Sequence, residues 1–262
     1  LSLNTTEGPK LQRLLPGSLK LLARFLYLHY QKKAYILVDE YDAPVNMIED
    51  EASLKQMLNF LKGFLGTTFK DNSYLEKGVM TGILNIAKAG TFSGLNNVDC
   101  YTTIEDRRYY ADFGFTEDEV RGLLAESHAS FPWEELVRWY NGYNIHGLRL
   151  YNPESVLSAI QQNKLASYWL STGDPKLIRT KLLTAGAAIK ETFYELIFNE
   201  AMDSPEALDP GIEVVAPREF SFDALQKDAS SIWNLLVASG YLTTTAVKEN
   251  IGGASYTLQV KI

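Results

Sequence analysis

The fold of this chain is decided by residues 34–42, which read AYILVDEYD. The first five residues are mostly apolar and β-prone, and they predict a strand buried on both faces, as in the middle of a parallel sheet. The acids that follow, Asp39 and Glu40, would emerge at the carboxyl end of this strand, where such sheets bind ligands. The alternative is a core strand that runs into a solvated acidic turn.

A second strand is predicted over residues 78–83, GVMTGI, and an amphipathic helix over about 53–66 lies between the two strands. Strand, helix and strand at this spacing form a βαβ unit, so the two strands should be parallel, with a right-handed crossover. Another helix is predicted over 18–31. Thr81 should then lie near the same sheet edge as Asp39, where a polar group can meet a phosphate or an attacking water.

Composition limits the classes of function. The 262 residues are 46% hydrophobic and 22% charged, which is ordinary for a globular chain with a sizeable core. The formal charge of −7 argues against a surface that binds nucleic acid by bulk electrostatics. A single cysteine, Cys100, excludes an internal disulfide and a multi-cysteine zinc site, and it favours an intracellular, cytoplasmic protein. No apolar run approaches membrane-spanning length, so no membrane partner is expected.

The second half of the sequence is mainly helical. We therefore predict the α/β class, with a parallel-sheet core over 1–130 followed by a helical lid over 131–262. The lid should end in a hairpin of strands at 241–247 and 256–262. A helix over about 229–239 precedes the hairpin, and together they resemble a winged-helix module.

Local patterns mark helix starts and a cluster of aromatic residues. Thr116 with Glu119 three residues later is a capping box, and Asn152 before a proline is a helix cap. Aromatic side chains gather at Trp139, Tyr140 and nearby positions. Because aromatics at helical spacing usually pack, we predict that this group forms part of a core.

A phosphate-binding loop is missing from the sequence. No glycine is followed by lysine, so the pattern G-x-x-x-x-G-K-[ST] does not occur. Without its backbone N–H groups and lysine, little would hold the β- and γ-phosphates of a nucleotide. The chain starts with Leu1 rather than methionine, which predicts a processed, trimmed or incomplete protein. Either the loop lies in an upstream segment that this chain lacks, or the chain is a degenerate relative of proteins that have it.

Several blocks in this order resemble the AAA-ATPase-like family of P-loop NTPases. These blocks are residues 35–44, 78–83, 92–97, 113–120, 139–144, 151–156, 168–172 and 239–243. The resemblance implies that residues 34–40 are a Walker B element, in which Asp39 is the Mg²⁺ partner and Glu40 the catalytic base, with Thr81 as the sensor. It implies ATP and Mg²⁺ as cofactors. This sequence departs from the family at Asn85, where a basic residue is often found.

Two hypotheses for function follow. In the first, the chain is the Walker B-to-lid portion of an ATPase that couples ATP binding and hydrolysis to an unknown partner, and this chain alone is inactive. The resemblance then implies a Walker A segment upstream and, as in many members, a nuclease-like domain of the PD-(D/E)XK type downstream. In the second, the chain is a non-catalytic module derived from that family, and it binds a protein or nucleic acid.

Overall fold

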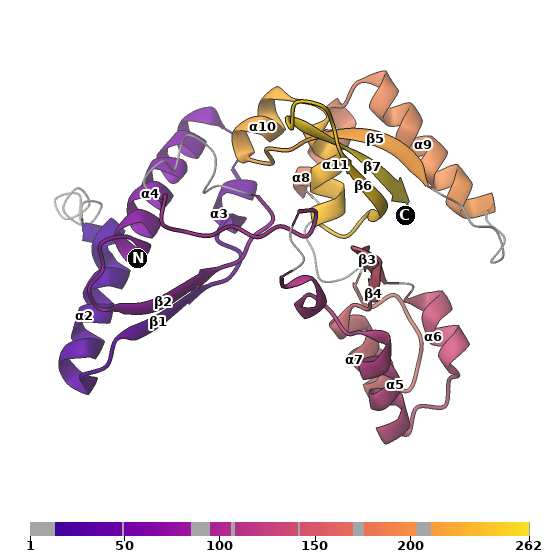
Figure 1. Cartoon of the computed structure of the whole chain (residues 1–262), viewed down its shortest axis with the longest axis horizontal. Coiled ribbons are helices and arrows are strands. Elements are labelled where there is room, and N and C mark those ends of the chain that lie inside the picture. Colours follow the sequence, from indigo (N-terminus) through magenta and orange to yellow (C-terminus); the bar gives the residue numbers. More distant parts are fainter. Residues whose placement is uncertain are drawn as a thin grey trace. The chain divides into compact units, whose positions relative to one another are not determined.

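The computed structural model describes residues 14–48, 50–84, 95–105, 108–140, 142–169, 176–202 and 211–261. The chain divides into two compact units, one made of residues 1–100 with 221–223 and the other of residues 101–220 with 224–262. Helices and strands both contribute, as expected for the α/β class (Figure 1). The described parts contain no helix that is long and apolar enough to cross a membrane.

The first unit contains a parallel βαβ arrangement. Strand β1 (Ala34–Val38) pairs in parallel with β2 (Leu75–Met80), and α4 (Glu51–Phe69) connects them. The predicted parallel pairing is therefore confirmed, although β2 begins three residues before the predicted strand and ends before Thr81. The other elements of this unit are η1 (Leu15–Gly17), α2 (Ser18–Tyr30) and the short α3 (Ala43–Asn46).

One face of this two-stranded sheet is covered by a helix. Gly78 of β2 lies against Phe69 at the end of α4, and a Cβ added at Gly78 would be only 2.3 Å from the ring. On the opposite face, Tyr35 and Leu37 are 69% and 75% exposed. The prediction of a strand buried on both faces is therefore wrong for the described residues, because alternate side chains of β1 point to a face that no described element covers.

The first part of the second unit is a helical cluster with a small hairpin. It contains η3 (Tyr110–Asp112), α5 (Glu117–Glu126), α6 (Trp133–Trp139), β3 (Tyr143–Ile145), β4 (Leu148–Leu150) and α7 (Pro153–Gln162). The buried side chains of this cluster are Val120, Leu136, Tyr140, Tyr151, Val156 and Ala159. Because α5 shares this core with α6 and α7, the units divide after Cys100, whereas the sequence placed a boundary at 130. The assignment of the two parts to an ATPase core and a lid stays a prediction.

Both predicted caps are present. The Thr116 hydroxyl accepts a hydrogen bond from the backbone N–H of Glu119 at 3.4 Å, and the Glu119 carboxylate accepts one from the Thr116 backbone at 2.8 Å. The hydrogen bonds that the Glu119 carboxylate accepts from the Thr116 backbone and hydroxyl lower the pKa of Glu119, because they stabilise its charged form. The Asn152 side chain accepts a bond from the backbone of Ser155 at 3.0 Å, which caps α7.

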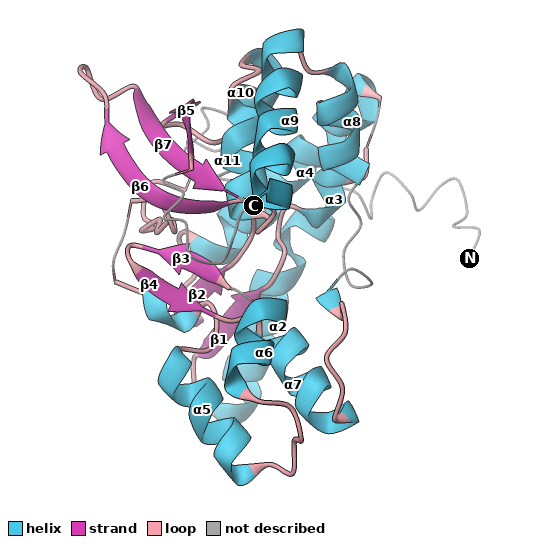
Figure 2. Cartoon of the chain, turned by 90° about the vertical axis from the view of Figure 1, so that its right-hand side faces the viewer, coloured by secondary structure: helices cyan, strands magenta, loops and turns pink. Residues whose placement is uncertain are grey.

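The rest of the second unit combines helices with an antiparallel sheet. The helices are α8 (Lys176–Thr184), α9 (Ala187–Met202), α10 (Phe222–Lys227) and α11 (Ser231–Ala238), and the strands are β5 (Ile212–Pro217), β6 (Thr243–Glu249) and β7 (Ser255–Lys261). The predicted hairpin is confirmed as β6 and β7, and the strand order is β5-β7-β6 (Figure 2). The inward side chains of this sheet are Val214, Ala216, Tyr256, Leu258 and Val260. The likeness to a winged helix stays a prediction.

Candidate functional site

The turns that follow β1 and β2 are joined by backbone hydrogen bonds. The Thr81 N–H donates to the carbonyl of Val38 at 2.9 Å, and the Tyr41 N–H donates to the carbonyl of Thr81 at 3.0 Å. These bonds continue the parallel pairing beyond Met80. They bring Thr81 beside Asp39, at the sheet edge where the sequence placed both residues.

The side chains of this edge also meet. The Thr81 hydroxyl donates a hydrogen bond to Asp39 Oδ1, and the same oxygen accepts the backbone N–H of Glu40 at 3.0 Å. Both side chains are exposed. Asp39 Oδ2 accepts no hydrogen bond from any described residue, so one carboxylate oxygen is available for a ligand.

Glu40 has an unusual backbone. Its φ of 49° lies in the left-handed region, which is uncommon for residues other than glycine. Its carbonyl accepts the N–H of Ala43 at 2.9 Å, which starts the turn into α3. The Glu40 carboxylate is exposed and pairs with none of the described side chains. Left-handed residues of this kind cluster at functional sites because the surrounding structure must hold them there.

Asp42 anchors the edge, although it was not among the predicted site residues. It is only 2% exposed, and its Oδ2 accepts the backbone N–H groups of Ile83 at 3.0 Å and Leu84 at 2.7 Å. A Cβ on Gly82 would lie 2.7 Å from Asp42 Oδ1, so the chain after β2 needs glycine at this position. One sequence pattern pointed to a local structural role for Asp42. An acid directly before Ala-Pro marks the start of a helix, here α3.

The donor set limits how a metal could bind. The described residues contain no group of three or more side chains of the His, Cys, Asp and Glu types that could hold a metal ion. Mg²⁺ commonly keeps several waters and binds through one or two carboxylates together with substrate phosphates. Asp39, with one unengaged oxygen beside the Thr81 hydroxyl, fits that mode of binding and does not fit an all-protein cage. Asn85 and residues 92–94 of the block 92–97 lie outside the described residues.

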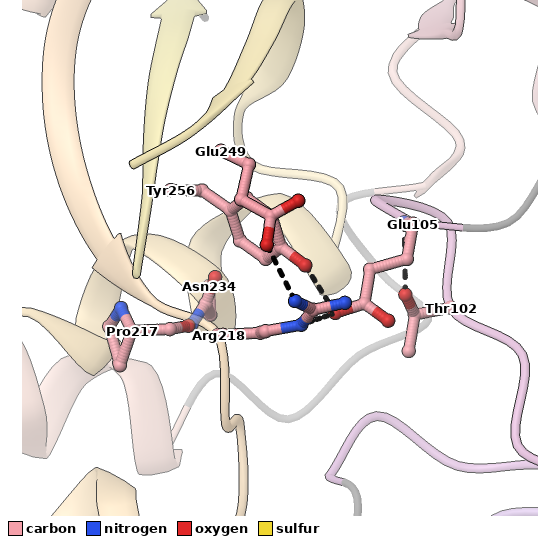
Figure 3. A network of polar contacts seen from close by, with 7 residues as sticks. All are labelled: Thr102, Glu105, Pro217, Arg218, Asn234, Glu249 and Tyr256. Atoms are coloured by element: carbon pink, nitrogen blue, oxygen red, sulfur yellow. Dashed lines mark hydrogen bonds and ion pairs between the residues drawn. The ribbon is translucent and has the colours of Figure 1, made fainter. Parts of the chain in front are cut away.

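A second polar cluster lies in the second unit, around Arg218 (Figure 3). Its guanidinium contacts Glu105 at 3.1 Å and Glu249 at 2.7 Å, and the Tyr256 hydroxyl donates a hydrogen bond to Glu105. Burial and the hydrogen bond to Glu105 raise the pKa of Tyr256 to about 12. Every charged group of this cluster already has a partner, so the cluster holds the 101–105 segment against the β5-β7-β6 sheet.

Comparison with known proteins supports the family resemblance. Residues 4–92, which include Asp39, Glu40 and Thr81, match the model of the AAA-ATPase-like family, described as a predicted AAA-ATPase. A protein of Azotobacter chroococcum mcd 1, described as an uncharacterized protein in the vnfD 5' region, is 28% identical over 219 residues. The alignment covers 83% of this chain and 38% of that relative. No solved structure matches the chain.

Proposed function

We propose that this chain, whose residues 4–92 match the AAA-ATPase-like family, is the Walker B-to-lid portion of an ATPase. The observation that carries the proposal is the hydrogen bond from Thr81 to Asp39 beyond the carboxyl ends of two parallel strands. Ligands of parallel α/β sheets bind at this edge. An exposed carboxylate oriented there by a neighbouring hydroxyl is what a nucleotide-bound Mg²⁺ requires.

Each residue of the edge has a distinct role in this proposal. Asp39 would hold the metal ion, and Thr81 keeps one oxygen of the Asp39 carboxylate in place. Glu40 takes a proton from the attacking water, since its carboxylate is exposed and unpaired among the described residues. When bound, Mg²⁺ with ATP would supply neutralisation of the charge that develops on the phosphates.

The activity of the whole protein is part of the proposal. This chain spans 38% of the length of the Azotobacter relative. We infer that the phosphate-binding loop lies in an upstream segment, and that a nuclease-like domain follows downstream, as the resemblance implies. The exposed apolar face at Tyr35 and Leu37 supports an upstream contribution, because further elements of a larger core would cover it.

A non-catalytic interaction module is the second candidate. The same exposed face of β1, together with the absence of any Gly-Lys pair, favours it. In this case Tyr35 and Leu37 would contact a partner protein instead of further elements of the same core.

Phosphate release separates the two candidates. The 262-residue chain should show no Mg²⁺-dependent ATP hydrolysis above background, because positioning by the phosphate loop dominates phosphoryl transfer. A longer protein that includes the upstream segment should hydrolyse ATP. In it, Glu40→Gln should abolish turnover and leave calorimetric ATP binding intact, whereas Glu76→Gln, at an exposed acid of β2, should change neither. Turnover by the short chain, or full activity of the Glu40→Gln protein, would show that the roles are wrongly assigned.

A further inference from the structure

An aromatic pocket of about 280 Å³ lies within the second unit. Its aromatic lining comes from separate segments of the chain and consists of Trp139, Tyr140, Tyr143, Tyr168, Trp169 and Tyr241. Tyr140 is buried, as predicted for a core residue, but Trp139 and Tyr241 are 51% and 38% exposed. Two of the rings, those of Trp169 and Tyr241, lie 5.5 Å apart and are tilted by 57°. The exposed rings of Trp139 and Tyr241 are therefore available to a ligand.

Two glycines allow the walls of the pocket to approach each other. Gly142 and Gly240 have φ values of 77° and 75°, and both line the pocket. A Cβ on Gly240 would lie 2.7 Å from the ring of Tyr143, and one on Gly142 would lie 2.3 Å from the carbonyl oxygen of Leu150. A larger residue at Gly240 would clash with the Tyr143 ring of the pocket wall, and one at Gly142 would clash with the backbone of Leu150, so the local backbone depends on glycine at both positions.

The polar groups of the pocket are incompletely paired. Ser155 is only 4% exposed and lines the pocket, yet its hydroxyl has no hydrogen-bond partner among the described residues. The Tyr143 hydroxyl accepts a bond from Asn152 at 3.3 Å and keeps its own proton to donate. By contrast, the Tyr140 hydroxyl is satisfied by the backbone of Ala166. The Ser155 hydroxyl is therefore reached from the pocket, where a polar group of a ligand can bond to it in place of water.

We propose that this pocket binds a nucleobase, stacked on the exposed aromatic rings and hydrogen-bonded at its edge to Ser155 and Tyr143. Every base has a π-face for stacking and polar atoms along its edge. None of the described residues that line the pocket is charged, so a phosphate group meets no cationic side chain among them. A quaternary ammonium ion would suit the rings but would leave the Ser155 hydroxyl unpaired.

The size of the pocket also favours a single base. Pockets for drug-sized ligands have volumes of about 300 to 1,000 Å³, so this one is near the lower limit. A base can come from a free nucleoside or nucleotide, or from a single-stranded nucleic acid. The pocket shares no residue with the edge formed by Asp39, Glu40 and Thr81, and the proposal does not depend on ATP hydrolysis.

Calorimetric titration of the full chain with adenosine, guanosine, cytidine and uridine tests this proposal. At least one nucleoside should bind, and its monophosphate should bind equally well. Trp139→Ala should weaken binding about tenfold, in the range known for base–aromatic stacking. Ser155→Ala should weaken it several-fold and alter the preference among bases. Tyr194→Ala, at an exposed aromatic of α9 outside the pocket, should bind as the parent does.

Further measurements separate this pocket from the proposed nucleotide site and identify the source of the base. Asp39→Asn should leave nucleoside binding unchanged, which separates this pocket from the proposed nucleotide site. A short single-stranded oligonucleotide that binds at least tenfold more tightly than the nucleoside would identify nucleic acid as the source of the base, and equal binding would identify the free nucleoside. The proposal is overturned if no nucleoside binds at millimolar concentration, if choline binds in preference, or if Trp139→Ala and Ser155→Ala both leave binding unchanged.

Discussion

Thr81 donates a hydrogen bond to Asp39, so the residues that follow two parallel strands are joined through their side chains. The two residues are 42 positions apart, and the crossover through α4 brings them together. The bond fixes one oxygen of the carboxylate. It thereby determines which oxygen is left to face a ligand.

Thr81→Val should test the strength of this link. The substitution keeps the shape of the side chain but removes the donor, and we expect the free energy of unfolding to fall by about 0.5 to 1 kcal/mol. The loss is small because both groups are exposed and water can replace the bond. Thr81→Ser keeps the hydroxyl and is the matched control. Urea denaturation of the three proteins measures the difference, and equal loss for both variants would mean that the bond contributes nothing.

Asp42→Ala should destabilise the chain far more than Asp39→Ala. The substitution at Asp42 leaves the N–H groups of Ile83 and the buried Leu84 without their acceptor, which should cost about 2 to 4 kcal/mol. Asp39 is exposed, so its removal should cost less than about 1 kcal/mol. Urea midpoints of the two variants give the comparison. If Asp39→Ala is the more destabilising, Asp42 is not the anchor of this edge.

The sequence predicts the elements that depend on local chemistry. The capping box at Thr116 and the Asn152 cap were recognisable because their hydrogen bonds join residues three apart. The parallel pairing of β1 and β2 followed from the spacing of apolar segments. The meeting of Asp39 and Thr81 followed in turn, because parallel strands end at a common edge.

What the sequence did not predict depends on long-range packing. Strand β5 went unrecognised because its short apolar run is stabilised by pairing with β7, about 45 residues further along the chain. The exposed face of β1 was misjudged because a continuous apolar run cannot reveal what covers it. The structural role of Asp42 depends on backbone groups 41 and 42 positions away. No local pattern contains such partners.

Glycine substitutions in the first unit should have opposite effects. Gly78→Ala places a methyl group 2.3 Å from the buried ring of Phe69, and the forced shift should destabilise by about 1 to 3 kcal/mol. Gly66→Ala, inside α4, meets nothing within 4 Å and should stabilise by about 0.5 to 1 kcal/mol through helix propensity. Thermal unfolding followed by circular dichroism measures both. A neutral Gly78→Ala variant would show that α4 does not pack tightly on β2.

The last prediction concerns alkaline pH. The pKa of Tyr256 is raised to about 12, first by burial and then by its hydrogen bond to Glu105, so the folded state retains the phenol proton where the unfolded state loses it. Because the unfolded pKa is about 10, the stabilisation from this group is complete below pH 10 and is lost as the pH rises towards 12.

Tyr256→Phe cannot ionise, and its stability should therefore fall less steeply than that of the parent over this interval. Urea midpoints between pH 9 and 12 provide the measurement, with Tyr194→Phe on α9 as a control that should follow the parent. Identical pH profiles for Tyr256→Phe and the parent would contradict the proposed burial and hydrogen bonding of the Tyr256 hydroxyl.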